Sequence, residues 1–324
     1  MSQSSLSHEA AATVCDSVRD QILEVVVTDA EFIETVLTGV VGRGHVLLED
    51  VPGTGKTLTA ISVAQALNLE FSRIQFTPDL LPSDITGSHV FNESAGEFEF
   101  TKGPIFANVV LADEINRAPP KTQAALLEAM DEGQVTVDGD THQLPEPFFV
   151  IATQNPVEQE GTFELPEAQR DRFMIKTSMG YPAREGELEL IARRGARTEK
   201  MPSVDPVVDA ETVAQLRMTA EDVTVDEQVG AYLVDLARAT REDDRTKIGM
   251  SPRGIQRFYE AARARAVVAG REYVAPDDVK RIAKPVIQHR LVLTTDTRIQ
   301  STTGGEIVDD VVESVAVPSV TPSA

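Results

Sequence analysis

The chain has 324 residues, of which 41% are hydrophobic and 25% are charged, and its formal net charge is −22 at pH 7. This is an ordinary globular composition, and the length suggests about two domains. The single cysteine, Cys15, cannot form an internal disulfide, which excludes a disulfide-stapled secreted domain. The first residues lack the pattern of a signal peptide, and no run is apolar and long enough to cross a membrane, so we expect a cytoplasmic protein.

The acidic charge balance bears on the choice of partners. Surfaces that bind nucleic acid are basic, so a net charge of −22 argues against nucleic acid as the main partner. Strongly acidic proteins in which arginine outnumbers lysine are also typical of salt-loving microbes, where the acidic surface keeps a protein hydrated in concentrated salt. In such an organism the charge would say little about partners, and both interpretations stay open.

Strands and helices alternate in the first half of the chain. We expect residues 1–15 to be a frayed N-terminus, followed by helical periodicity over 16–38 that is interrupted at 25–28. Apolar runs predict buried strands, and periodic segments predict helices and one hairpin: strands at 44–50, 108–114 and 148–156, helices at 57–69 and 121–132, and a hairpin around Asp138 and Gly139. This alternation predicts an α/β core over 16–182, with a parallel sheet flanked by helices.

The second half of the chain reads as helical. A helix is expected at 184–197, and after a proline-rich loop the periodicity from 209 to 289 stays helical with no strong strand. These segments predict a smaller all-α domain over 183–300. Residues 301–324 are expected to form a mostly flexible tail, with at most one short amphipathic helix at 308–315.

The strongest motif is a phosphate-binding loop, DVPGTGKT at residues 50–57, which lies between a strand and a helix. Glycines let backbone N–H groups wrap around phosphate oxygens, and the helix N-terminus favours an anion. Lys56 supplies positive charge to the β- and γ-phosphates, and the Thr57 hydroxyl is a ligand for Mg²⁺. The strict pattern opens with glycine, where this chain has an aspartate. The residues predicted to hold the nucleotide are Asp50, Val51, Pro52, Gly53, Thr54, Gly55, Lys56, Thr57 and Leu58.

Two other predicted strands end in polar residues. Asp113 and Glu114 follow the run VVLA, and carboxylates at that edge of a sheet can hold Mg²⁺ and orient or deprotonate an attacking water. Asn155 ends the third strand, where it would hold the water or touch the γ-phosphate. The plainer alternatives are that the carboxylates cap the next helix and that Asn155 forms a turn before Pro156.

Three arginines are candidates for contact with the γ-phosphate. Arg170 and Arg172 lie in LPEAQRDRF, and either one could reach a neighbouring subunit's nucleotide or form a surface salt bridge. Arg253 follows Ser251 and Pro252 at the start of a helix, where a cation is unfavourable for the helix dipole, so a phosphate is its better partner. The five histidines show no zinc-ligand spacing, and we expect no zinc site.

Together these motifs resemble the MoxR-type AAA+ ATPases, a helix-2-insert group related to the motor subunits of magnesium chelatase. GHVLLEDVPGTGKT is similar to the family's Walker A region, LADEINRAPPKTQAALLEAMDEGQVTVDG to its Walker B region, ATQNPVEQEGTFELPEAQRDRF to its sensor 1 and arginine-finger region, and SPRGIQRF to its sensor 2. QFTPDLLPSDITG and FNESAGEFEFTKGPIF resemble the flanks and body of its insert. Arg170 stands where the family commonly has leucine, and the segment VVVTDAEFIE departs from the usual V-V-G-Q pattern, which leaves the adenine contacts open.

The resemblance implies an AAA+ P-loop core with a C-terminal helical lid, and a hexameric ring that hydrolyses ATP with Mg²⁺. It implies catalytic roles for Lys56, Asp113, Glu114 and Asn155, an arginine finger at Arg172 that acts on the neighbouring subunit, and nucleotide contact by Arg253. Thr57 and Asp113 would be the protein's metal ligands. It also implies a chaperone-like role in maturing or activating protein complexes, with a von Willebrand factor A domain protein as the usual partner and no membrane insertion.

Three other functions compete with that of a protein remodeller. A nucleic-acid motor is disfavoured by the net charge of −22 and by an insert, FNESAGEFEF, that lacks basic residues. The motor subunit of a metal chelatase would share the insert and the adhesion-domain partner. A scaffold that binds ATP without hydrolysing it is disfavoured by the intact Asp113 and Glu114 pair.

Overall fold

The computed structural model describes residues 4–94, 96–156, 161–196 and 202–318. Its centre is a parallel sheet with the strand order β2-β5-β8-β1-β9. The strands are β1 (Val46–Glu49), β2 (Phe71–Gln75), β5 (Val109–Asp113), β8 (Phe149–Gln154) and β9 (Ile175–Thr177). The expected strands near 46, 109 and 149 are confirmed. The strands β2 and β9 were not predicted: both lie at an edge of the sheet and are only partly buried, so neither has the continuous apolar run of a central strand.

Both faces of the sheet are buried, each in its own core. In β1, Val46 and Leu48 pack into one hydrophobic cluster and Leu47 packs into the other, and β5 shows the same alternation. Successive strand side chains point to opposite faces, so a continuously apolar strand needs cover on both sides. That cover comes from α1 (His8–Leu23), α2 (Ala30–Val41) and α3 (Lys56–Ala66) on one face and from α4 (Pro82–Thr86) and α5 (Pro120–Glu132) on the other.

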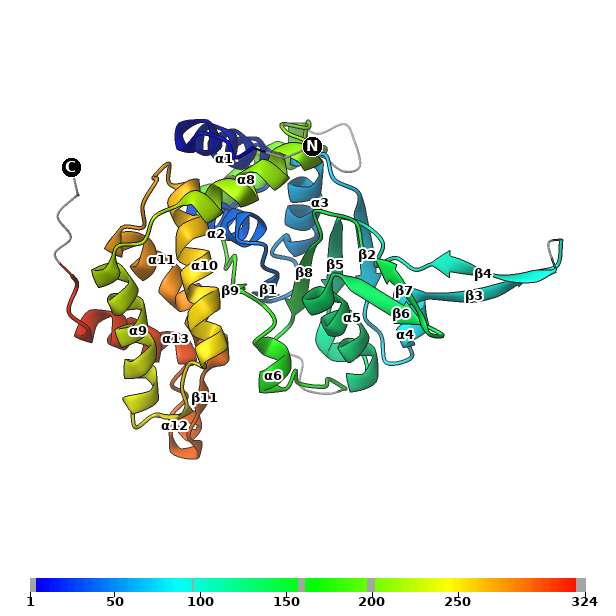
Figure 1. Ribbon diagram of the computed structural model, residues 1–324. Coiled ribbons are helices and arrows are strands. Elements are labelled where there is room, and N and C mark those ends of the chain that lie inside the picture. Colours follow the sequence, from blue (N-terminus) through cyan, green and yellow to red (C-terminus); the bar gives the residue numbers. More distant parts are fainter. Residues whose placement is uncertain (1–3, 95, 157–160, 197–201, 319–324) are drawn as a thin grey trace.

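Two hairpins extend the core. The strands β3 (Gly87–Asn92) and β4 (Glu97–Lys102) form a long arm that projects away from the sheet (Figure 1). The strands β6 (Gln134–Val137) and β7 (Asp140–Gln143) follow α5 and turn at Asp138 and Gly139, as predicted. The insert segment FNESAGEFEF lies in the first of these hairpins, whose first strand begins at Gly87.

In the sequence, the one-turn helix α6 (Glu167–Arg170) and the helix α7 (Arg184–Ala196) come between the central strands and a helical lid, which stands to one side of the sheet in Figure 1. The lid helices are α8 (Ala210–Asp222), α9 (Glu227–Glu242), α10 (Pro252–Val268), α11 (Pro276–Ile287), α12 (Thr295–Ile299) and α13 (Gly304–Ser314). Asp209 and Ser251 cap α8 and α10 with their side chains, which fixes where these helices begin. A short antiparallel pair, β10 (Thr246–Ile248) and β11 (Val292–Leu293), interrupts a region that was expected to be helical throughout.

Both ends of the chain are more ordered than the sequence suggested. The helix α1 begins at His8, inside the segment 1–15 that was expected to be frayed, because the Ser7 side chain caps it and Ala11 and Cys15 are buried. In the tail at 301–324, the short amphipathic helix expected at 308–315 is confirmed but begins earlier: Gly304–Ser314 form α13, which buries Ile307 and Val308 in the lid core. The end of the helix expected at 184–197 lies outside the described residues.

Candidate nucleotide-binding and catalytic site

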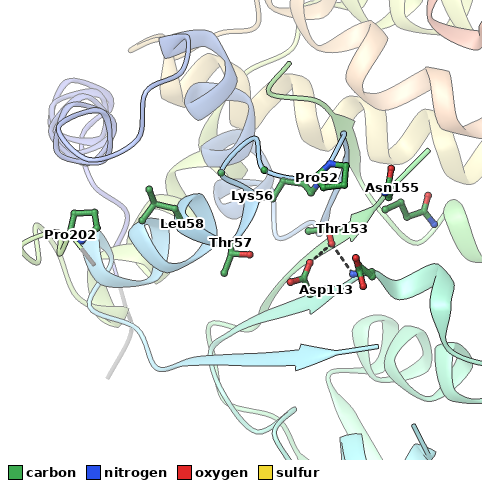
Figure 2. A pocket seen from close by; sticks show the side chains of 12 residues that line it. Pro52, Lys56, Thr57, Leu58, Asp113, Thr153, Asn155 and Pro202 are labelled. Atoms are coloured by element: carbon green, nitrogen blue, oxygen red, sulfur yellow. Dashed lines mark hydrogen bonds between the residues drawn. The ribbon is translucent and has the colours of Figure 1, made fainter. Parts of the chain in front are cut away.

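A cavity of about 500 Å³ lies at the carboxyl ends of β1, β5 and β8. In parallel α/β sheets this edge is where ligands bind. Figure 2 shows Lys56 and Thr57 at the start of α3, across from Asp113 and Asn155 at the strand ends. The lining residues come from the loop after β1 and from the ends of β5 and β8, with one proline before the lid: Pro52, Gly53, Gly55, Lys56, Thr57, Leu58, Asp113, Glu114, Thr153, Gln154, Asn155 and Pro202.

The phosphate loop has the backbone that its sequence predicts. Gly53 and Gly55 have φ values of +88° and +104°, a left-handed conformation that favours glycine. Lys56 Nζ donates to the carbonyl oxygens of Asp50 at 2.6 Å and Val51 at 2.8 Å, so the ammonium is held inside the loop. Burial lowers the pKa of Lys56, and the nearby carboxylates of Asp50 and Asp113 oppose that shift. If a phosphate bound in the loop, the Lys56 ammonium would exchange its two carbonyl partners for a group with a full negative charge.

Lys56→Ala is expected to weaken ATP binding while leaving the fold intact, because the side chain contacts only the loop and the cavity. Truncating one partner of a buried, hydrogen-bonded charge pair costs about 2–5 kcal/mol, or roughly 30- to 5000-fold in Kd. Titration with a fluorescent ATP analogue measures this, with Lys121→Ala as the control, because Lys121 is exposed on α5 and does not line the cavity. A Kd within a few-fold of wild type for Lys56→Ala would remove this lysine from the site.

The carboxylates at the end of β5 belong to one hydrogen-bond network. Thr153 Oγ1 donates to Asp113 Oδ1 at 2.6 Å and accepts from the Glu114 N–H at 2.8 Å, which Figure 2 shows as dashed lines. Glu114 has a φ of +56°, an unfavourable conformation for a residue with a side chain. Thr153 on the neighbouring strand therefore holds both Asp113 and the strained Glu114 in place at the edge of the cavity.

Three polar residues near these carboxylates were not predicted. Arg73 on β2 donates to Asp113 Oδ2 from Nε at 3.1 Å and from a terminal nitrogen at 2.6 Å. Gln75 on the same strand donates to Glu114 Oε2 at 2.8 Å. The third is Thr153 itself. The alternation in FSRIQ could have indicated β2, whose register places Gln75 beside Asp113.

Asp50 does not line the cavity, although it was predicted to bind nucleotide as part of the loop. Its Oδ2 accepts hydrogen bonds from the Met179 N–H at 2.8 Å, the Gly180 N–H at 2.9 Å and the Ser178 hydroxyl at 3.2 Å. Residues 178–180 connect β9 to the elements that lead into the lid. An aspartate at the first position of the loop therefore ties the phosphate loop to this connection. Val51 and Thr54 also lie outside the lining.

Asp50→Ala is expected to reduce stability more than nucleotide affinity. The substitution removes the acceptor of two buried or half-buried N–H groups, and hydrogen bonds to a charged group contribute about 1.5–3 kcal/mol. Lys56 bonds the backbone carbonyl of Asp50 and not its carboxylate, and an alanine at position 50 keeps that carbonyl. Denaturant unfolding and analogue titration of the same preparation measure the two effects, with Asp50→Asn expected to lie between wild type and alanine. Unchanged unfolding with lost binding would mean that the carboxylate serves the nucleotide directly.

The candidate arginines lie away from the cavity. Arg172 Nε is 3.1 Å from Asp131 Oδ2, and a terminal nitrogen of Arg253 is 2.6 Å from Asp131 Oδ1. Asp131 is on α5, Arg253 begins the lid helix α10, and Arg170 ends α6. None of these arginines is among the described residues that line the cavity. The structure therefore brings Arg172 and Arg253 together on a shared carboxylate, instead of placing Arg253 over its own subunit's phosphates.

The donor set suits Mg²⁺ bound together with a nucleotide. Thr57 and Asp113 face the cavity, and the described residues contain no cluster of three or more His, Cys, Asp or Glu side chains that would hold a metal on their own. Mg²⁺ typically takes one or two protein oxygen ligands and completes its shell with phosphates and water. Thr57 and Asp113 are the residues that would hold it.

A parallel sheet with this strand order, a phosphate loop after its first strand and a helical lid define a P-loop ATPase of the AAA+ class. Residues 45–175 match the ATPase family associated with various cellular activities (AAA), and residues 238–311 match the AAA lid domain. The first matched segment contains the strands β1, β2, β5 and β8 and ends at the start of β9, and the second contains the lid helices α10, α11 and α12 with parts of α9 and α13.

The chain belongs to the MoxR family of AAA+ ATPases. It is 41% identical to the chaperone MoxR1 of Mycobacterium tuberculosis, over 93% of this chain and 81% of that protein. It is 44% identical to the uncharacterized protein YeaC of Bacillus subtilis, over 92% of this chain and 93% of that protein. The crystal structure of a candidate ATPase from Cytophaga hutchinsonii has a TM-score of 0.88 at 39% identity, covering 96% of this chain and 97% of the other. Within the described residues, every helix is too short or too polar to span a bilayer.

Proposed function

We propose that this protein hydrolyses ATP with Mg²⁺ to remodel, mature or activate protein complexes. The observation that carries the proposal is the gathering of Lys56, Thr57, Asp113, Glu114 and Asn155 around one cavity of about 500 Å³. A loop for phosphates, a pair of metal ligands and a carboxylate for the attacking water are the parts that ATP hydrolysis needs. The relative named as a chaperone supports the remodelling role.

In this mechanism Lys56 leaves the carbonyls of Asp50 and Val51 and binds the β- and γ-phosphates. Bound at Thr57 and Asp113, Mg²⁺ would neutralise phosphate charge. The Glu114 carboxylate accepts hydrogen bonds from Gln75 at 2.8 Å and from Arg117 at 3.0 Å, which orient it beside the cavity. From there it takes the proton of the attacking water, and Asn155 at the end of β8 holds that water toward the γ-phosphate.

The cavity by itself lacks an arginine among its described lining residues, and two arginines are held together elsewhere on Asp131. We therefore place Arg172 and Arg253 in the ATP site of a neighbouring subunit, in a homo-oligomeric ring that we take to be a hexamer. Arg172 stabilises the charge of the transition state, and Arg253 contacts the same phosphates. Arg170 is the alternative finger, because it lies two residues away at the end of α6.

The proposed partners are a client protein complex and a protein with a von Willebrand factor A domain, met in the cytoplasm, where ATP is supplied. The β3–β4 arm would face them, because it projects from the core (Figure 1) and its phenylalanines Phe91 and Phe98 are exposed. The acidic residues Glu93, Glu97 and Glu99 on the same arm count against a nucleic-acid motor. If the chain were instead the motor subunit of a metal chelatase, we would expect it to co-purify with a porphyrin-metallating subunit.

The proposal is tested by measuring steady-state ATP hydrolysis and ring size together, with and without Mg²⁺, DNA and RNA. We expect Mg²⁺-dependent hydrolysis, a ring whose population rises with ATP, and no stimulation by either nucleic acid. A protein that binds ATP tightly without turning it over would be a nucleotide-gated scaffold. Hydrolysis that depends on DNA or RNA would assign the chain to the nucleic-acid motors.

A further inference from the structure

The lid carries a buried cation that the proposed mechanism does not use. Arg290, in the 3₁₀ turn Gln288–Arg290 after α11, is only 8% exposed. Burial lowers its pKa to about 10, and the Asp171 carboxylate opposes that shift, so the guanidinium stays charged at neutral pH. Burying a charge is costly unless its donors are satisfied, and an apolar residue would fill the same space at lower cost. The hydrogen-bond partners of Arg290 therefore indicate why a charged side chain is present at this buried position.

Besides the Val286 carbonyl and His289 in the lid itself, the partners of Arg290 lie in the core, in the segment that contains the candidate finger. Arg290 Nε donates to Asp171 Oδ1 at 2.7 Å. Its terminal nitrogens donate to the carbonyl oxygens of Phe173 at 2.8 Å and Met174 at 3.2 Å. These three acceptors flank Arg172 in sequence, so one lid side chain fixes the backbone on both sides of the finger.

The two residues before Arg290 make the same kind of contact. Gln288 Nε2 donates to the Lys176 carbonyl oxygen at 2.8 Å, and His289 Nε2 lies 2.9 Å from the Phe173 carbonyl oxygen. Burial lowers the pKa of His289 well below its usual value, so the imidazole is neutral. We call Gln288, His289 and Arg290 the lid clamp. All three bond residues 171–176, and Arg290 alone brackets Arg172.

The phosphate loop contacts the segment that leads toward the lid of its own subunit. Asp50 opens the loop, whose residues Pro52, Gly53, Gly55, Lys56 and Thr57 line the cavity, and its carboxylate accepts hydrogen bonds from the Met179 and Gly180 N–H groups. A change in the loop on nucleotide binding would act on this segment, and the lid clamp joins the lid to residues 171–176.

We propose that Arg290 is a positioning residue that fixes Arg172 to the lid of its own subunit, so that a lid movement caused by ATP in one site moves the finger in the neighbouring site. This inference rests on the proposed action of Arg172 in the neighbouring subunit. Arg290 never touches the nucleotide itself. It acts on hydrolysis in the next subunit and leaves ATP binding in its own subunit unchanged.

The test compares Arg290→Met with Arg265→Met. Arg265 is also a lid arginine that is 8% exposed, but its ion pair is with Glu34 on α2 and not with a residue of 171–176, so it controls for the loss of a buried cation. Arg290→Met is expected to bind an ATP analogue like wild type and to lose about 10²-fold in kcat, the usual effect of a misplaced catalytic group. Arg265→Met is expected to keep a kcat within about three-fold of wild type.

Mixed rings then distinguish a misplaced finger from a general loss of activity in the substituted subunit. In rings mixed with Lys56→Ala subunits, whose finger and lid clamp are intact, the Arg290→Met subunits should regain hydrolysis at their own sites. The inference is overturned if folded Arg290→Met keeps a kcat within two-fold of wild type, or if mixing restores nothing. If Arg290→Met does not fold, Asp171→Ala is used instead, because Asp171 is the carboxylate that Arg290 contacts. A roughly ten-fold loss in kcat that is restored by mixing with Lys56→Ala subunits supports the inference, and any other result overturns it. Wild-type kcat in Arg172→Ala would instead refute the proposed finger.

Discussion

Glu114→Gln is expected to bind ATP like wild type and to hydrolyse it about 10²–10⁴-fold more slowly, the usual effect of losing a general base. Glutamine keeps the shape of the side chain and still accepts a hydrogen bond where Oε2 now accepts from Gln75 and Arg117. What it loses is the negative charge that takes the proton from water. Single-turnover hydrolysis of radiolabelled ATP, with analogue titration beside it, measures both quantities.

The matched control is Glu128→Gln, which removes a carboxylate of the same kind from the exposed face of α5. It should keep wild-type turnover. Steady-state hydrolysis that is unchanged in Glu114→Gln would remove this residue from the mechanism and leave Asp113 as the remaining acidic group among the described residues that line the cavity. Because the substituted protein should hold ATP without hydrolysing it, it is also the form in which client and partner proteins are best captured.

Arg172→Ala is expected to have the largest effect on turnover. An arginine finger contributes about 10³–10⁵ in rate, while ground-state binding of ATP depends on the loop around Lys56. The substituted protein should therefore bind ATP nearly normally and hydrolyse it very slowly. Arg170→Ala, made in parallel, should retain most activity. The reverse pattern, with Arg170→Ala inactive and Arg172→Ala active, would move the finger to the end of α6.

Sequence patterns predicted the parts of the site that are local in the chain. The loop at 50–57, the pair Asp113 and Glu114, and Asn155 each follow an apolar strand, and parallel strands bring their carboxyl ends to one edge. Thr153 was passed over because nothing in its own neighbourhood signals a role. Its importance comes from the register, which pairs Ala152 with Ala112 and so sets Thr153 beside Asp113.

Interactions between distant segments could not be read from the sequence. A cation in the first turn of α10 predicted that Arg253 serves a phosphate, which stays a prediction. In the structure Arg253 bonds Asp131, 122 residues away, and the pattern gave no means of finding that partner. Asp50 looked like a variant position of a phosphate loop, and its bonds to residues 178–180 depend on how β9 lies beside β1. Charged side chains make such contacts without any periodic signal.

The sequence underestimated how far the helices at the two ends extend, for a related reason: α1 begins at His8 and α13 at Gly304. A serine- and alanine-rich start and an acidic tail have weak apolar patterns of their own, and isolated helices of this length are marginal in water. In the folded chain, α1 and α13 gain stability from packing: Ala11 and Cys15 lie in the same hydrophobic cluster as Ile307 and Val308 of the lid. Their stability comes from tertiary contacts that composition does not reveal.

The most direct test of a shared active site is to mix Arg172→Ala protein with Lys56→Ala protein. Each should be nearly inactive alone, the first because its rings lack fingers and the second because its sites bind ATP too weakly and lack the lysine that contacts the β- and γ-phosphates. A mixed ring contains interfaces where an intact Lys56 site meets an intact Arg172, so hydrolysis should return in proportion to the fraction of such interfaces. Rings shown by native mass spectrometry to be mixed, yet without recovered hydrolysis at any mixing ratio, would contradict the action of Arg172 in the neighbouring subunit.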